Sequence, residues 1–163
     1  MRAPSICNIT VVFVVTALFL AVLPARSGDR PVPADFHLTL ERTLCEGMCP
    51  AYLVGIFADG RVEFWGRQFV ATYGPDSSRV SADVVTALWR ACQDANVFSL
   101  DTLYDAPVTG WPNAIITLTA GGRATRITDA QARAQTPLAL RRVEVLMDSL
   151  LNTAHWITRS EGK

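Results

Sequence analysis

Apolar and polar side chains alternate in the first half of the chain, and this alternation predicts strands. The segment 36–42 alternates strictly, as expected of a half-buried strand, and its apolar positions are Phe36, Leu38 and Leu40. A nearly continuous apolar segment, 52–58, is followed by Asp59-Gly60 and then by a second alternating segment, 61–65. An Asp-Gly pair between two such segments predicts a tight hairpin in which both turn residues adopt positive φ.

Three further segments also have strand character. Residues 68–73 are expected to form a strand that ends at Gly74-Pro75, which completes an antiparallel meander with the segments before it. Further along the chain, 113–119 and 123–128 are rich in β-branched residues and meet around Gly121-Gly122. This arrangement predicts a second hairpin.

Two segments place apolar residues at helical spacing. The first begins after Ser81, which can cap a helix, and ends near Asn96. Its apolar stripe comprises Val84, Val85, Leu88, Trp89, Cys92 and Ala95. The second begins at Thr136-Pro137, a cap and first-turn pair, and ends near Asn152. Its stripe comprises Leu140, Val143, Met147, Leu150 and Leu151.

The order of these elements is four strands, a helix, two strands and a helix. Consecutive hairpins give an antiparallel sheet, and two helices with one apolar stripe each can cover one face of it. The predicted fold class is therefore α+β, with two layers, a mainly antiparallel sheet of about six strands, and the order ββββ-α-ββ-α. The long segment between the first helix and the second hairpin is expected to be a loop.

The N-terminal part of the chain resembles a targeting segment. Ile9 to Leu23 is an apolar run, and Ala25-Arg26-Ser27 places small residues before a cleavage point at Gly28. Residues 1–27 are therefore expected to be a signal peptide, with an uncleaved N-terminal membrane anchor as the alternative. Cys7 precedes the apolar run, whereas a lipid-attachment cysteine would follow it.

The rest of the chain divides simply under this interpretation. Residues 28–34 form an exposed leader, 35–157 a single globular domain, and 158–163 a tail. The expected location is the periplasm or the extracellular space, with the membrane touched only by residues 1–27 if they are not cleaved.

The charge of the chain excludes one class of partner. Fifteen basic residues balance fifteen acidic ones, and removing residues 1–27 takes away Arg2 and Arg26, which leaves a net charge of −2. No basic patch emerges, so nucleic acid is not expected as a partner.

Cys45 and Cys49 bracket Glu46-Gly47-Met48, and Pro50 follows them. An exported chain meets oxidising conditions, and Gly47 permits a tight turn, so a Cys45–Cys49 disulfide is expected. Thiol exchange favours two intervening residues and a helix N-terminus, and this segment has neither. Metal binding needs about four ligands, and His37 is the only histidine nearby. Cys92 lies on an apolar stripe and is expected to be a buried free thiol.

No catalytic set is visible in the sequence. His37 and His155 are the only histidines, no serine lies in a nucleophile elbow, and no cofactor motif is present. Tyr104 and Trp111 lie in the loop between the first helix and the second hairpin, where exposed aromatic residues can anchor a partner. Trp111 folded back over the sheet edge is an equal alternative.

The leading hypothesis is a non-catalytic binding or interaction module of the cell envelope, whose ligand or partner protein the sequence does not name. The first alternative is a thiol-active or metal-dependent enzyme that uses Cys45 and Cys49. The second is a structural envelope protein anchored in the membrane by its N-terminus.

The run from Cys45 to Tyr52 reads C-x-G-x-C-P-x-Y, and a strand, Asp59-Gly60 and another strand follow it. It resembles the opening of a family of small exported bacterial domains of unknown function, and the resemblance extends over about 35–156. It implies an architecture and no activity. Members carry Thr-Asp-x-Pro before the second hairpin, whereas this chain has Thr109-Gly-Trp-Pro112, with Gly110 in place of the acid.

Overall fold

The computed structural model describes residues 30–104, 110–130 and 136–158. The predicted signal peptide, the start of the leader and most of the predicted tail lie outside these residues. Among the helices in the described ranges, none combines the length and the apolar character needed to cross a bilayer.

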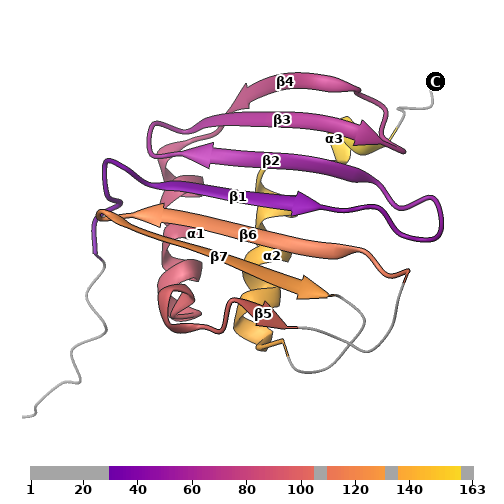
Figure 1. Ribbon diagram of the computed structural model, residues 1–163. Helices are drawn as coiled ribbons and strands as arrows, with labels where there is room; N and C mark the ends of the chain where they lie inside the picture. Colours follow the sequence, from indigo (N-terminus) through magenta and orange to yellow (C-terminus); the bar gives the residue numbers. More distant parts are fainter. Residues whose placement is uncertain (1–29, 105–109, 131–135, 159–163) are drawn as a thin grey trace, which may run out of the picture.

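The chain forms one sheet with helices on one side of it (Figure 1). The strands are β1 (His37–Arg42), β2 (Ala51–Phe57), β3 (Arg61–Gln68), β4 (Gly74–Arg79), β5 (Leu103–Tyr104), β6 (Asn113–Ala120) and β7 (Arg123–Ala130). The helices are α1 (Ala82–Asp94), a 3-10 turn η1 (Val97–Ser99), α2 (Leu138–Leu150) and α3 (Ala154–Ile157). The predicted α+β class and the order ββββ-α-ββ-α are confirmed.

Within the described residues, the sheet has seven strands in the order β4-β3-β2-β1-β6-β7-β5. Every pair is antiparallel except β5 with β7, which run parallel over two residues. The strand β5 lies where the sequence predicts a loop, and its two residues are too few to produce a readable alternation. β1 lies at the centre, between the β2–β4 meander and the β6–β7 hairpin.

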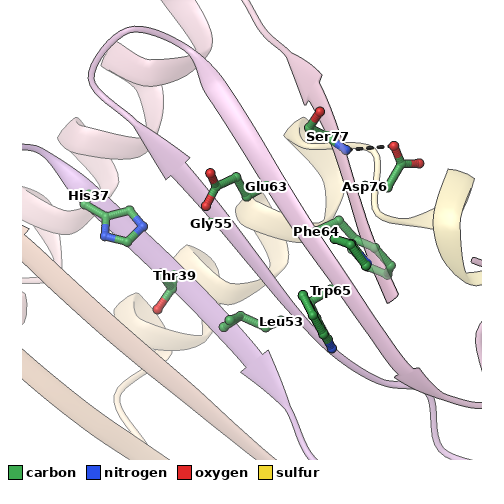
Figure 2. A pocket seen from close by; sticks show the side chains of 10 residues that line it. His37, Thr39, Leu53, Gly55, Glu63, Phe64, Trp65, Asp76 and Ser77 are labelled. Carbon is green, nitrogen blue, oxygen red and sulfur yellow. Dashed lines mark hydrogen bonds between the residues drawn. The ribbon is translucent and has the colours of Figure 1, made fainter. Parts of the chain in front are cut away.

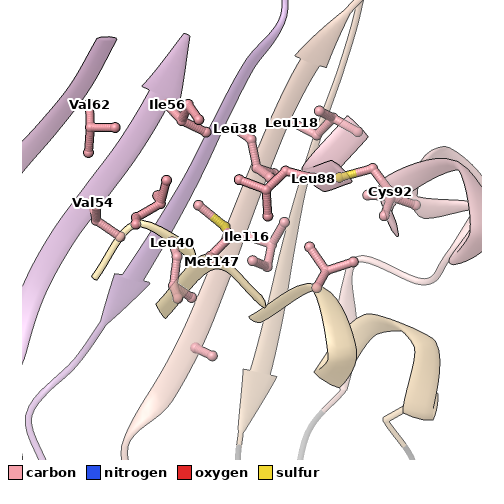
Figure 3. Close-up of a cluster of buried hydrophobic side chains, with 14 of the residues drawn as sticks. Leu38, Leu40, Val54, Ile56, Val62, Leu88, Cys92, Ile116, Leu118 and Met147 are labelled. Atoms are coloured by element: carbon pink, nitrogen blue, oxygen red, sulfur yellow. The ribbon is translucent and has the colours of Figure 1, made fainter. Parts of the chain in front are cut away.

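The core fills the space between the sheet and the two long helices (Figure 3). The inward positions predicted for the first strand, Phe36, Leu38 and Leu40, are all fully buried. Opposite them, α1 contributes Val85, Leu88, Trp89 and Cys92, and α2 contributes Leu140, Val143 and Met147. Both helices therefore cover the same face of the sheet, as their apolar stripes predict.

Both predicted hairpins are present, but the first turn differs in type. Gly121 and Gly122 both have positive φ, as a two-residue hairpin turn requires. At the first hairpin only Gly60 has positive φ, and its N–H donates to the carbonyl of Phe57 at 3.0 Å. The loop is therefore the three-residue form with glycine in the left-handed position.

The fourth strand is displaced from its predicted place. Residues 69–73 form a turn, with Phe69 at φ 54°, and the strand begins at Gly74 instead of ending there. Pro75 is tolerated in β4 because this is an edge strand, where one side of the backbone needs no partner. The second long helix begins at Leu138, since Thr136 donates its hydroxyl to Asp129 at 2.6 Å instead of capping the helix.

Candidate functional site

The sheet face opposite the helices, called the open face below, is covered by no helix or strand of the described part of the chain (Figure 1). Its side chains are the outward positions of the same strands that build the core. On β1, β2 and β3 they are His37, Thr39, Glu41, Leu53, Gly55, Phe57, Arg61, Glu63 and Trp65. These residues are half-buried or exposed, apart from Gly55, which lies beneath its neighbours.

Three of these side chains stack across three neighbouring strands. The imidazole of His37 lies parallel to the ring of Phe57, with centroids 4.1 Å apart and planes 10° apart. The guanidinium carbon of Arg61 lies 3.7 Å from the centroid of the same ring. Partial burial lowers the pKa of His37 from its ordinary value, with Glu63 opposing the shift and Arg61 adding to it. His37 is therefore a neutral ring at physiological pH.

Two residues further along the strands, the open face is hollow. The strand register places Gly55 between Thr39 and Glu63, and Leu53 beside Trp65. Thr39, Gly55 and Glu63 form the row between the His37–Phe57–Arg61 stack and the Leu53–Trp65 pair. Because Gly55 has no side chain, the centre of this row is empty. Figure 2 shows the surrounding side chains projecting around Gly55 from the neighbouring strands.

This hollow, called the Gly55 trough below, has a volume of about 630 Å³. Its lining residues are His37, Thr39, Leu53, Gly55, Glu63, Phe64, Trp65, Pro75, Asp76 and Ser77. Trp65 is 52% exposed. A β-carbon at position 55 would lie 3.2 Å from Nε2 of His37 and 3.2 Å from Cγ2 of Thr39, so a larger residue would fill the floor.

The cysteine turn lies at the end of β1, beyond the trough. Cys45 and Cys49 are joined by a disulfide with Cα atoms 5.7 Å apart, and Cys92 is buried and free, as predicted. The tip of the turn is solvent-exposed, with Met48 83% accessible. Within the described ranges, no group of three or more His, Cys, Asp or Glu side chains is arranged to hold a metal ion.

The turn also contacts the segment before β6. The N–H of Glu46 donates to the carbonyl of Gly110 at 2.9 Å. Gly110 has φ 85°, and a β-carbon there would lie 2.3 Å from Cδ of Glu46. The side chain of Glu46 therefore occupies the space that a side chain at position 110 would need.

A model of a protein family, described as a domain of unknown function (DUF6438), matches residues 36–151. The chain belongs to the DUF6438 family. The match spans the described elements from β1 to α2, and it agrees with the expected domain of unknown function. None of the curated proteins matches the chain.

In this DUF6438 domain, the tyrosine after the cysteine turn contributes to a charged cluster under the sheet. The hydroxyl of Tyr52 donates to Oδ1 of Asp148 at 2.6 Å, and Arg42 donates to Oδ2 of Asp148 at 2.8 Å and to Glu144 at 3.2 Å. Burial opposes the charge of Arg42, but Asp148 and Glu144 outweigh it and leave its pKa raised. Burial, then Asp148, raises the pKa of Tyr52. The cluster fixes both ends of the cysteine turn to α2.

The two predicted loop aromatics take different positions in the DUF6438 fold. Tyr104 is half-buried in β5 and packs against the core, and its hydroxyl accepts a hydrogen bond from the N–H of Asp101 at 3.2 Å. Trp111 is 56% exposed and does not line the trough. The rest of that loop, 105–109, lies outside the described residues. Sequence reasoning missed Trp65 and Gly55, although Trp65 stands at an outward position of an alternating strand where a polar residue is usual.

Proposed function

We propose that the protein is an exported, non-catalytic binding module that holds its ligand at the Gly55 trough on the open face. The observation that carries the proposal is the trough itself. It is a hollow with one exposed tryptophan and several polar groups, built on regular strands that hold their side chains in a fixed arrangement. Pockets of this size and mixed character are typical of ligand sites.

The arrangement of polar groups supports binding more than catalysis. His37 lies on β1 and Ser77 lies on β4, so β2 and β3 separate them. Neighbouring strands are about 4.8 Å apart, which places these two strands roughly 14 Å apart, too far for a nucleophile and its base. His37 instead stacks on Phe57, a contact that fixes the ring.

Export is part of the proposal and rests on the apolar run Ile9–Leu23 with its small-residue cleavage point. The disulfide at Cys45 and Cys49 agrees with an oxidising compartment. Cell fractionation with intact-mass measurement tests this part. A mass that begins at Gly28 supports cleavage, and a mass that includes residues 1–27 in a membrane fraction supports the anchored alternative.

The binding site can be tested through the four tryptophans of the chain. The protein is labelled with 5-fluorotryptophan, and the four ¹⁹F signals are assigned by single Trp→Phe variants. Protein, glycan and lipid fractions of a cell-envelope extract are then added. We expect at least one fraction to shift the Trp65 signal while the signals of the buried Trp89 and Trp156 stay in place.

Trp111 is the matched control, because its exposure is close to that of Trp65 and it lies outside the trough. A fraction that shifts only Trp111 would move the site to the loop before β6. If no fraction shifts Trp65, the open face is not a binding site and the proposal is wrong.

One contact favours the thiol-active alternative. The N–H of Gly47 donates to Sγ of Cys45 at 3.2 Å, a contact that would also stabilise a thiolate. Thiol labelling of the native protein decides between the two functions. An exchange enzyme would yield two reactive thiols at Cys45 and Cys49 after mild reduction, with turnover of a mixed disulfide. A structural disulfide would resist mild reduction, and its loss would cost about 2 kcal/mol because the closed loop is short.

A further inference from the structure

We infer that the Gly55 trough binds one ring of an uncharged pyranose sugar, which stacks on Trp65 and forms hydrogen bonds across the floor of the trough. This inference rests on the proposed function, since it names the ligand class of the same site. It follows from three features of the trough: an aromatic wall, a row of hydroxyl-binding groups, and the pairing of its charges.

The wall of the trough is formed by Trp65 with Leu53 beside it. The strand register pairs these two residues and pairs Trp65 with Pro75 on the other side, so three apolar side chains line one edge. A pyranose ring has an apolar C–H face with hydroxyl groups around its rim. The negative face of an indole attracts such C–H groups, and its large area matches the broad C–H face of a pyranose chair.

The floor of the trough is polar on both sides of Gly55. Glu63 and Ser77 lie on the β3–β4 side, and Thr39 and the imidazole of His37 lie on β1 (Figure 2). Sugar hydroxyls both donate and accept hydrogen bonds. A carboxylate accepts strongly from them, serine and threonine do both, and a neutral imidazole offers one donor and one acceptor.

Gly55 keeps the space for the ring. A β-carbon there would approach Nε2 of His37 and Cγ2 of Thr39 at 3.2 Å, and any larger side chain would project into the trough. Glycine weakens a strand interior and often marks a place where a ligand approaches the backbone closely. Its presence in β2, between Thr39 on β1 and Glu63 on β3, agrees with an occupied trough.

The charges around the trough favour an uncharged ligand. Glu63 is paired with Arg61, which is itself held over Phe57. Asp76 pairs with the core residue Phe64, so its carboxylate projects to the other side of the sheet, where it accepts a hydrogen bond from Nε1 of Trp156 at 2.8 Å. An anionic ligand would meet the carboxylate of Glu63, and a cationic ligand would compete with Arg61 for it. Hydroxyl groups can use the carboxylate of Glu63 without adding charge.

Isothermal titration calorimetry of the purified protein tests this assignment with four trisaccharides. Tri-N-acetylchitotriose and cellotriose are uncharged, chitotriose is cationic and trigalacturonate is anionic. We expect at least one uncharged trisaccharide to bind, with affinity about 10-fold or more above that of either charged probe, and we expect Trp65→Ala and Gly55→Val each to lower that affinity by about 10-fold or more. Trp111→Ala, the matched control, should leave the affinity unchanged.

Melting temperatures of the variants establish that each one folds, and Glu63→Gln supplies a second test because it keeps an acceptor and removes the charge. The inference is overturned if a charged trisaccharide binds best, if none of the four binds, or if Trp111→Ala removes binding while Trp65→Ala retains it. A shift of the Trp65 ¹⁹F signal by a protein or lipid fraction, with no sugar bound, would overturn the sugar assignment and leave the proposed binding face standing.

Discussion

The two faces of the sheet are made from alternate residues of the same strands, yet they carry different kinds of side chain. The covered face carries Leu38, Leu40, Val54, Ile56, Ile116 and Leu118, all of which are fully buried. The open face carries an imidazole, hydroxyls, carboxylates, guanidiniums and two large aromatic rings between them. Successive side chains of a strand point to opposite faces of the sheet. The inward residues therefore stabilise the fold, and the outward residues are available for recognition.

This difference implies that substitutions on the two faces should have separable effects. On the covered face, each change removes packing or a charge partner that water cannot replace. On the open face, water replaces most lost contacts, so stability should change little, and the affinity for the proposed ligand should change instead. Matched pairs of variants, one on each face, test this implication directly.

The largest contrast is expected between two arginines. Arg42 on the covered side binds Asp148 and Glu144, whereas Arg126 on the open face lies 3.4 Å from Glu41 and is half exposed. Arg42→Met should lower the free energy of unfolding by about 3–5 kcal/mol, because it removes the guanidinium that Asp148 and Glu144 share under the sheet. Arg126→Met should cost about 0–1 kcal/mol. Equal losses in urea denaturation would contradict the comparison.

Next in size is a pair of adjacent isoleucines on β6. Ile116 points into the core and Ile115 lies on the open face. Ile116→Ala should cost about 2–5 kcal/mol through lost burial and the cavity left behind. Ile115→Ala should cost about 1 kcal/mol, since the side chain is only half-buried. Denaturant midpoints, with an unchanged dependence of the free energy of unfolding on denaturant concentration, give both changes in stability. A larger loss of stability for Ile115→Ala would show that the open face is covered in solution.

Two glycines give a smaller contrast. A β-carbon at Gly66 would lie 1.9 Å from the carbonyl oxygen of Thr72, which belongs to the backbone. Gly66→Ala should therefore cost about 1–3 kcal/mol as an overpacked site. A β-carbon at Gly55 would have its closest contacts, at 3.2 Å, with side-chain atoms of His37 and Thr39, so Gly55→Ala should lower the melting temperature less than Gly66→Ala. A stable Gly66→Ala variant would mean that the 69–73 turn can shift without loss.

The pH dependence of stability should differ between the faces as well. Burial raises the pKa of Cys92 from 9.0 to about 12. The contribution of the buried thiol to folding stability is therefore complete below pH 9 and is lost as the pH rises from 9 to about 12. The expected slope is about 1.4 kcal/mol per pH unit. Tyr52, whose pKa is also raised, affects the slope of stability against pH only above its ordinary pKa of 10. Between pH 9 and 10, Cys92→Ala should therefore flatten the stability curve, and an unchanged slope there would contradict the burial of the thiol.

His37 provides the opposite and smallest effect. Burial lowers its pKa below 6.5, so its contribution is present above pH 6.5 and is lost as the pH falls below that value. Because the ring is partly exposed, the loss should be slight. His37→Gln should remove a shallow acid-side slope in stability between pH 6.5 and 5, measured by thermal unfolding, without affecting the alkaline side.

Most of the fold could be predicted because its strands and helices depend on the local spacing of apolar residues. The alternation at 36–42, the stripes of both helices and the glycine pair at 121–122 each specify one element and its buried side. The predicted place of the fourth strand is wrong because a Gly-Pro pair usually ends a strand, whereas Gly74-Pro75 begins this one. Whether a strand lies at an edge, where proline is tolerated, depends on the sheet order, which is not a local property.

The candidate site could be predicted only in part. The disulfide and the buried thiol follow from spacing and helical periodicity, whereas the trough depends on register between β1, β2 and β3. No local signal pairs His37 with Phe57 or places Gly55 opposite both Thr39 and Glu63. Likewise, the contact of Glu46 with Gly110 joins segments more than sixty residues apart, and only the assembled sheet brings them together.

The position of β1 has a consequence for how the molecule folds. Its partner on one side, β2, follows immediately, but its partner on the other side, β6, pairs Leu38 with Leu118 and so closes a loop of about eighty residues. The meander can form early and locally, while the centre of the sheet is complete only when most of the chain is available. Until then one edge of β1 is unpaired, and a chain interrupted before β6 exposes it to association with another strand.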